Sequence, residues 1–505
     1  MKEKWKQLPV SVRAALVFGI CSFLSSGISF ILMPLFTRIM SKEQYGIVTD
    51  YNSWHYIIEV FAVLGLASVG SFNVGLNEYR DRRDRFVSSM LIMANLATLA
   101  VFAFVFAVKG IAVNDFILSW PLLICMFIGF LFSPATTFFL ARKRYEYKYR
   151  TGAIVTIGSI IAIQGLAVIL VLIFGENPAE LAEATETVTK TTAGLQSSEW
   201  KVLGTLIGTL IFGIPLYLYQ MKRGIANKDN DTAIGTTTPE STQTTRKMMK
   251  EMFIFTLPLL PHYLALHVMN GADRIMVGKL DSVSSEAVYG VASSLGLAAA
   301  TIWTAINGSL QPYIFGKLND GDTSAVKKTT KYLLAFYAGL CVVVSLMAPE
   351  LLMILAPAKY SDGLAAIPPI IGMAFLNALY NVYASIEFYH KKSVGIAVAT
   401  IVSAGLNIGL NAWLIPIYGL PAAAYTTLIA NAVLTFCHYI GYRLADKRNI
   451  FSDLTFLALS VVCIAACLAS SFLYNIIWVR YVIIAVIAIV IIIKRDILLK
   501  FLKLK

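Results

Sequence analysis

Three polar residues lie at helical spacing inside an apolar stretch near the N-terminus. Asn52, His55 and Glu59 are separated by three and four residues, so a helix would place their side chains on one face. A carboxyl group at membrane depth is unfavourable unless it is protonated or paired, and an imidazole changes its charge near neutral pH. The spacing leaves two interpretations open: a proton or sodium coupling site, or a structural polar pair between helices.

The composition places these residues in a membrane protein. Of the 505 residues, 57% are hydrophobic and 14% are charged, whereas soluble proteins carry about 25% charged residues. Apolar runs of about 17 to 25 residues have the length of a membrane-spanning helix. They begin near residues 14, 47, 86, 116, 153, 202, 252, 288, 332, 364, 394, 420, 454 and 476. We therefore expect an all-α polytopic membrane protein with fourteen transmembrane helices.

The positive charges predict which ends of these helices face the cytoplasm. With the N-terminus inside, most of the 42 Lys and Arg residues fall in the inner segments, which is the side where such residues are retained. Both termini are therefore expected to be cytoplasmic. The outer loop 176–200 is acidic and is interpreted as a solvated hairpin or a substrate lid. The inner segment 221–250 is rich in Thr, Asn and Lys and is expected to be a flexible linker.

Prolines and cysteines inside the expected spans favour structural roles. Pro258, Pro261 and the pair at 368–369 predict kinks or local unwinding. The six cysteines all lie in apolar stretches, where disulfides are not expected. Cys463 and Cys467 have no His or second Cys pair nearby that would complete a tetrahedral site, so no metal site is expected.

Short strings recur between the two halves of the chain and predict an internal repeat. Tyr45-Gly46 matches Tyr289-Gly290 at a shift of 244 residues, and Arg38-Ile39-Met40 matches Arg274-Ile275-Met276 at a shift of 236. Each half holds six expected helices, and an even number makes the repeats parallel. The expected domains are a six-helix bundle at 1–220, a cytoplasmic linker at 221–250, a second six-helix bundle at 251–445, and two additional transmembrane helices with a basic tail at 446–505. Two such bundles would face each other across a cavity and rock about a central site.

Several longer strings resemble a known family of transporters. The segment Pro34 to Gly46, PLFTRIMSKEQYG, resembles the first-helix signature of polysaccharide-type transporters of the multidrug/oligosaccharidyl-lipid/polysaccharide exporter superfamily. The second half is similar to the sequence of that family across helices nine to twelve. The similarity lies in the segments 348–350, 359–360, 390–392, 414–419 and 422–426, with Asn407 and Asn411. The resemblance covers nearly the whole chain apart from the acidic loop and the linker.

The resemblance implies a flippase that moves an undecaprenyl-diphosphate-linked oligosaccharide repeat unit across the bacterial cytoplasmic (inner) membrane by alternating access. Its product would feed the assembly of capsule, exopolysaccharide or O-antigen. The expected partners are the lipid-linked oligosaccharide and membrane lipids, and further candidates are a polysaccharide polymerase and a chain-length regulator. No cofactor is expected apart from a coupling ion, H⁺ or Na⁺.

A lipid diphosphate requires cations in a protected cavity, and arginine binds phosphate oxygens through two parallel donors. Arg38 and Arg274 are related by the expected repeat and lie at the outer ends of their helices, so they are candidate diphosphate ligands. The alternative is that both side chains extend to the outer membrane interface. A polar stripe on the helical face of Arg274 either lines the sugar path or packs between helices; its other members are Tyr263, His267 and Asn270. Asn407 and Asn411, one turn apart, are interpreted as polar contacts between helices.

No enzymatic motif accompanies these residues. The sequence has no Gly-rich phosphate loop followed by Lys-Ser or Lys-Thr, no HExxH and no nucleophile elbow, so the chain is not expected to be an enzyme or to hydrolyse ATP. The net charge of +13 comes without a nucleic-acid-binding motif, so no nucleic-acid partner is expected. One alternative is a cation-coupled multidrug exporter of the same superfamily. Another is a membrane polysaccharide polymerase, which would be expected to have a longer, reactive outer loop.

Overall fold

The computed structural model describes residues 10–66, 69–111, 118–175, 195–232, 240–390, 392–448 and 450–493, and all regular elements in these ranges are helices. Eleven helices in this part of the chain are long and apolar enough to cross a membrane, which makes the chain a multi-pass membrane protein. The three other expected spans correspond to α3 (Lys42–Ala62), α11 (Leu260–Leu280) and the shorter apolar helix α19 (Ile477–Ile493). The count of fourteen and the cytoplasmic termini stay predictions.

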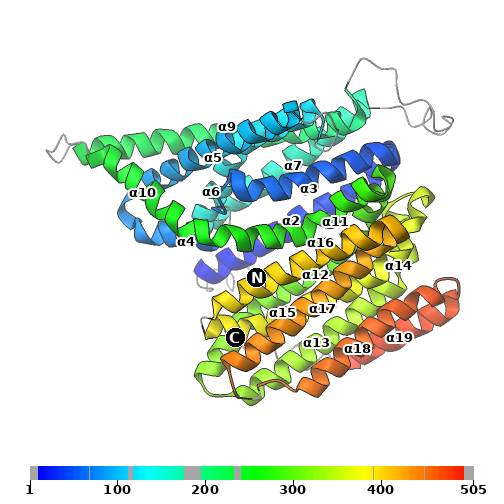
Figure 1. The fold of residues 1–505 in the computed structure, drawn as a ribbon. Helices are drawn as coiled ribbons and strands as arrows, with labels where there is room; N and C mark the ends of the chain where they lie inside the picture. The colour runs from blue at the N-terminus through cyan, green and yellow to red at the C-terminus, as the bar shows by residue number, and fades with distance from the viewer. Residues whose placement is uncertain are drawn as a thin grey trace. The chain divides into compact units, whose positions relative to one another are not determined.

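The chain divides into two compact units, Met1–His267 and Val268–Lys505. The division falls within α11, whereas the sequence predicts a linker at 221–250. Besides α3 and the first part of α11, the helices of the first unit are α2 (Val10–Ile39), α4 (Val69–Glu78), η1 (Arg80–Arg82), α5 (Arg83–Ile111), α6 (Trp120–Tyr145), α7 (Tyr149–Phe174), α9 (Ser197–Thr232), α10 (Glu240–Thr256) and η2 (Leu257–Leu259) (Figure 1).

The second unit repeats the same pairing of helices. After the last part of α11 it contains α12 (Val283–Asn319), α13 (Thr323–Leu346), α14 (Ala348–Leu355), η3 (Ala358–Ala365), α15 (Ile367–Tyr389), α16 (Ser393–Tyr418), α17 (Leu420–Ala445), α18 (Asp453–Ala469), η4 (Ser470–Leu473) and α19. In the first unit α9 packs on both α6 and α7, and in the second unit α17 packs on both α15 and α16. Two copies of one bundle would produce this pairing, although the repeat itself stays a prediction from the sequence.

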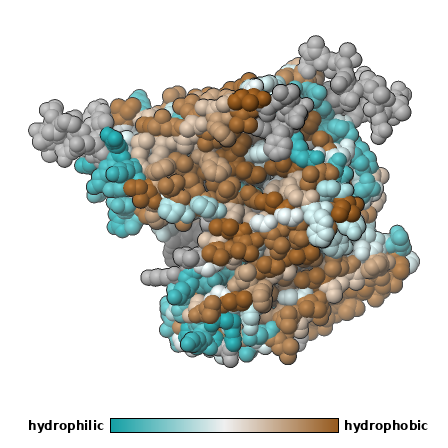
Figure 2. Space-filling view, viewed as in Figure 1, coloured by the Kyte–Doolittle hydropathy of each residue, from teal (hydrophilic) through white to brown (hydrophobic). Residues whose placement is uncertain are grey.

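The surface of the helices is suited to contact with lipid. Large apolar side chains are exposed along the helices, among them Phe104, Ile154, Trp413 and Leu457. On the face shown in Figure 2, apolar residues cover the sides of the helices, and hydrophilic residues gather toward the helix ends. Apolar surface spread along the helices in this way is rare on monomeric soluble proteins, so it agrees with the expected membrane environment.

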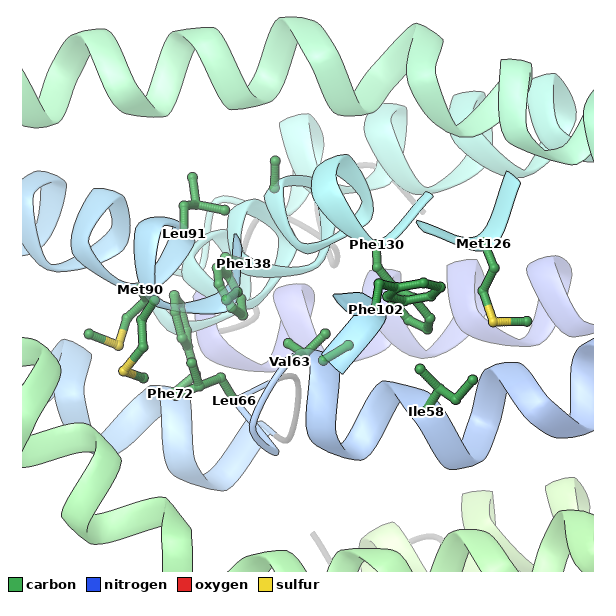
Figure 3. Packing of buried hydrophobic residues seen from close by; sticks show 14 of the residues in the cluster. Ile58, Val63, Leu66, Phe72, Met90, Leu91, Phe102, Met126, Phe130 and Phe138 are labelled. Carbon is green, nitrogen blue, oxygen red and sulfur yellow. The ribbon is translucent and has the colours of Figure 1, made fainter. Parts of the chain in front are cut away.

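The segment expected to be a flexible linker is helical in its described part. α9 continues to Thr232 and α10 begins at Glu240, while 233–239 lies outside the described residues. Met248 and Met252, one turn apart on α10, are buried in the apolar core of the first unit. The core is built mainly from α3 to α6 (Figure 3). The polar composition suggested a flexible segment, but the apolar face of α10 has a partner. The acidic stretch 176–194 lies outside the described residues.

The prolines confirm one expectation and contradict another. Pro258 lies in η2, the short 3₁₀ turn that separates α10 from α11, which is the predicted local unwinding. The kink predicted at Pro368 and Pro369 is wrong, because both residues lie in the first turn of α15. The first N–H groups of a helix have no intrahelical partner, so proline removes no hydrogen bond there.

Two glycines allow α7 and α9 to pack backbone against backbone. A Cβ atom on Gly204 would lie 2.6 Å from the Ala167 Cα, and one on Gly208 would lie 2.4 Å from the Ile163 Cα. Small residues four apart are typical of close helix contacts in membranes. In the second unit, the matching contact between α16 and α17 contains polar side chains instead.

Candidate functional site

A buried carboxylate in the second unit lies at the centre of a polar network between four helices. Asp273, on α11, is 5% exposed. Asn411 Nδ2 on α16 donates to Asp273 Oδ1 at 2.6 Å, and Thr427 Oγ1 on α17 donates to Oδ2 at 2.5 Å. The Tyr289 hydroxyl on α12 donates to Oδ2 at 3.3 Å. Each of the helices α12, α16 and α17 therefore provides at least one donor to the carboxylate of α11.

Two further polar side chains, those of Asn407 and Thr426, complete this network. Asn407, one turn before Asn411, donates from Nδ2 to Thr427 Oγ1 at 3.1 Å. The Thr426 hydroxyl is positioned to donate to Asn411 Oδ1 or to the Ala423 carbonyl. The four side chains that α16 and α17 contribute are all buried: Asn407, Asn411, Thr426 and Thr427. Buried polar groups are stable when they are hydrogen-bonded, and here they form one connected set of oxygen and nitrogen atoms.

Among the described residues no cation is paired with the Asp273 carboxylate, although the neighbouring Arg274 acts electrostatically on Tyr289. No described salt bridge includes Asp273, and the donors that reach it are neutral. A carboxylate enclosed in an apolar bundle is strongly disfavoured unless a proton or a cation neutralises it. Rotation of an Asn amide exchanges its oxygen and nitrogen atoms, so Asn407 and Asn411 can turn oxygens toward a cation, beside the oxygens of Asp273 and Thr427. Oxygen ligands suit hard cations. The network can therefore hold H⁺ or Na⁺.

Asp273 is the residue that the sequence analysis missed. Asn407 and Asn411 were identified as polar contacts between helices, and the structure confirms this: Asn407 joins α16 to α17 and Asn411 joins α16 to α11. The signal for Asp273 was a lone acidic residue inside an expected span, which is the same argument that identified Glu59.

The predicted coupling residues on α3 have separate surroundings. Asn52 is exposed. His55 stacks on Phe130 of α6, with ring centroids 4.4 Å apart. Glu59 is half-buried, and it interacts electrostatically with His267. All three side chains lie in the described part of the chain, and no hydrogen bond joins any two of them.

The electrostatic interaction of Glu59 with His267 links two predicted sets of residues within the first unit. The His267 ring lies 6.3 Å from the ring of Tyr56 on α3, and its Nδ1 lies 2.8 Å from the Tyr263 carbonyl. The Tyr263 ring packs on Gly65, which has a φ of +64° and where a Cβ would lie 2.7 Å from Tyr263 Cδ2. The first part of α11 therefore packs along α3 and the turn that follows it.

The two candidate phosphate ligands differ in their surroundings. Arg38 is exposed in the last turn of α2, and its Nη1 donates to the Pro34 carbonyl at 2.8 Å. Arg274 is half-buried on α11 and acts electrostatically on Tyr289. The side chain of Asn270 lies outside the described residues. The roles of these residues in binding substrate stay predictions.

Solved structures of membrane transporters share this fold. The lipid II flippase MurJ in an inward closed conformation matches with a TM-score of 0.58 and 16% identity, over 96% of this chain and 100% of that chain. An inward-facing multidrug resistance MATE family transporter of the MOP superfamily matches with a TM-score of 0.55 and 12% identity, over 88% of this chain and 96% of that chain. A MATE in complex with MaL6 matches with a TM-score of 0.52 and 14% identity, over 90% of this chain and 97% of that chain. At these identities the likeness shows the fold, which is that of MOP superfamily transporters.

The sequence also matches a family. The sequence profile of the family described as polysaccharide biosynthesis protein matches residues 11–316, which is more than half of the chain. The chain therefore belongs to the polysaccharide biosynthesis protein family, and its fold is the one seen in solved transporters of the MOP superfamily. This confirms the family resemblance of the sequence strings. No curated protein sequence matches the chain.

Proposed function

We propose that this protein is a flippase for lipid-linked oligosaccharides. The observation that carries the proposal is its membership of the polysaccharide biosynthesis protein family, combined with a multi-pass transporter fold. MurJ, which shares the fold, is a lipid II flippase. The proposed substrate is an undecaprenyl-diphosphate-linked repeat unit, moved to the outer leaflet of a bacterial inner membrane for capsule, exopolysaccharide or O-antigen synthesis.

The transport step follows from the chemistry of such a substrate. Its isoprenoid tail is stable in lipid, whereas the sugars and the diphosphate are unfavourable in hydrocarbon. The protein must offer a polar environment that opens to one side of the membrane and then to the other. We propose alternating access, in which the two compact units are the moving bodies.

The Asp273 network is the proposed site of ion coupling. When its ion leaves, the carboxylate carries a negative charge inside an apolar bundle. That state favours an arrangement of α11, α16 and α17 in which water or a new ion reaches Asp273. Binding and release of H⁺ or Na⁺ would therefore shift the equilibrium between two conformations. The set Asn52, His55 and Glu59 is the alternative coupling site.

A reconstituted assay tests the function. The purified protein is placed in vesicles with a lipid-linked oligosaccharide, and translocation is measured as the loss of accessibility of the sugar to an impermeant glycosidase. We expect the wild type to translocate the lipid-linked oligosaccharide. We also expect the rate of translocation to rise when an inward or outward gradient of Na⁺ or H⁺ is imposed. Transport of hydrophobic cations without any oligosaccharide translocation would instead support the multidrug exporter. Lengthening of the lipid-linked sugar by the pure protein would support a polymerase.

Two matched substitutions locate the coupling site in the same assay. Asp273→Asn removes the charge and keeps the size, so we expect it to abolish the response to the ion gradient and to slow translocation about tenfold or more. Asp320→Asn changes an exposed carboxylate at the end of α12 and should leave both rates unchanged. If Glu59→Gln removes the ion response and Asp273→Asn does not, the coupling site lies on α3.

A further inference from the structure

A lysine ammonium lies between two aromatic rings at one end of the first unit. Lys201, in the second turn of α9, places its Nζ 3.9 Å from the centroid of the Phe36 ring and 4.9 Å from the centroid of the Tyr45 ring. Phe36 belongs to the last turns of α2 and Tyr45 to the first turn of α3. A cation is attracted to the face of an aromatic ring. Three helices therefore meet around one positive charge.

No carboxylate neutralises Lys201 within the ranges that the structure describes. Glu199, two residues earlier, accepts a hydrogen bond from the backbone N of Gln196. The Gln44 amide donates to Gln196 Oε1 and accepts from the Ser198 backbone N. The polar groups at this end of α9 therefore bind one another. The groups recorded in contact with the Lys201 ammonium are the two aromatic rings.

The position of Lys201 is unfavourable for stability. The side chain is half-buried in a helix with the properties of a membrane span, where an ammonium without an anionic partner is disfavoured. It also lies close to the N-terminal end of α9, where the helix dipole disfavours a positive charge. The attraction to the rings offsets only part of the free-energy cost of burying the ammonium and of placing it near the positive end of the helix dipole. Residues that lower stability at a defined position are typical of functional sites.

We propose that Lys201 is a phosphate-binding residue, held between Phe36 and Tyr45 until the diphosphate of the lipid-linked substrate reaches it. The identity of this ligand rests on the proposed function. Lysine binds phosphate as a point charge from any direction, and the two rings lower the local polarity, which strengthens the attraction. Arg38, in the last turn of α2, is at the same end of the unit and provides a second cation. The charge distribution of the sequence predicts that this end faces outward, so the contact belongs to the outward part of the transport cycle.

The test compares binding and thermal stability in the full-length protein. Lys201→Met removes the charge and keeps an unbranched side chain. We expect K201M to melt at a higher temperature than the wild type and to bind farnesyl diphosphate about tenfold or more weakly, because a charged hydrogen bond is lost. Lys201→Arg keeps the charge and should retain most of the binding. Lys222→Met changes an exposed lysine on the same helix and should alter neither property.

Two further probes identify the source of the phosphate. Farnesol lacks the diphosphate and should bind the wild type and K201M equally. Nanodiscs of phosphatidylglycerol, compared with phosphatidylcholine, test the bilayer headgroup. If phosphatidylglycerol competes with farnesyl diphosphate in the wild type and not in K201M, Lys201 binds the membrane rather than the substrate, and the proposal is overturned.

Other outcomes also overturn the proposal. Equal binding of farnesyl diphosphate by K201M and the wild type would show that Lys201 does not bind the diphosphate. A lower melting temperature of K201M would show that Lys201 stabilises the fold at this position, which contradicts a residue held there for binding. These results are distinct from failure of the proposed function, in which the wild type itself neither binds farnesyl diphosphate nor translocates a lipid-linked oligosaccharide.

Discussion

Buried charged side chains in the second unit are balanced in two different ways. Asp273 accepts hydrogen bonds from neutral groups only, whereas Glu387 on α15 is paired with His438 on α17, with Oε2 and Nδ1 2.5 Å apart. Both members of this pair are at most 2% exposed, and the Tyr380 ring stacks on His438 with centroids 5.2 Å apart. An acid and a base in contact balance each other without an external ion. We therefore expect Asp273 to respond to ions, and Glu387 with His438 to contribute to stability.

Removal of one partner tests the Glu387–His438 pair. His438→Ala leaves Glu387 without its base, and loss of one member of a buried pair lowers the free energy of unfolding by about 3 to 5 kcal/mol. The carboxylate fits only because Gly441 has no side chain, since a Cβ there would lie 2.1 Å from Glu387 Oε1. We expect a large fall in the melting temperature in detergent for His438→Ala, and a smaller fall for Glu387→Gln, whose amide still forms a hydrogen bond. An unchanged melting temperature in both variants would contradict this role.

At the scale of helices, the corresponding pairs α7–α9 and α16–α17 pack through different kinds of contact in the two units. α7 and α9 approach closely at Gly204 and Gly208, whereas α16 and α17 are joined through Asn407 and Thr427. Close backbone contact increases van der Waals packing, and it leaves no space for an ion. The polar contact leaves oxygen atoms between the helices, which is why the candidate coupling site lies in the second unit.

Substitution of Gly208 tests the close contact. Gly208→Leu would force a side chain against the backbone of α7 at Ile163, so the two helices must separate. We expect a lower melting temperature and a lower yield of folded protein, with a loss of about 1 to 3 kcal/mol or more of stability. Gly165→Leu is the matched control on α7, because a Cβ at Gly165 meets nothing within 4 Å. Equal effects of both substitutions would show that the contact is unimportant.

At the scale of the whole molecule, the last two helices are tied to the second unit by polar contacts. Arg480 of α19 donates to both carboxylate oxygens of Glu350 at 2.7 and 2.8 Å, and to the Leu346 carbonyl at 2.8 Å. The Ser470 and Ser345 hydroxyls lie 2.7 Å apart. The sequence places the segment 446–505 outside the expected repeat, and the structure packs α18 against α13 and α15. These helices are therefore an integral part of the second unit.

The contact of Arg480 with Glu350 predicts a pH dependence. Arg480 lowers the pKa of Glu350, which lies on the short helix α14. Because the folded pKa is lowered, this stabilisation is present above the unfolded pKa of a glutamate, about 4.3, and is lost as the pH falls through the folded value. We expect the melting temperature of the wild type to fall more steeply below about pH 4.3 than that of Glu350→Gln. Parallel curves for the two proteins would contradict the prediction.

The sequence by itself determined the class of the protein and most of its helices. Long apolar runs are local features, so they predict membrane helices without knowledge of packing. The strings from Pro34 to Gly46 and after 348 identified the family. The sequence also identified single polar residues such as Glu59, His267 and Arg38 as unusual at membrane depth. It was wrong where a local signal depends on context, as at the proline pair of α15.

Only the tertiary structure decided which of these residues meet. Asp273 contacts Asn411 and Thr427, which are 138 and 154 residues away in the chain. Lys201 reaches the rings of two other helices. Helical periodicity determines which residues share a face of one helix, but it contains no information on which other helix that face contacts. The partners of a buried charge, and therefore its chemistry, depend on how the helices pack.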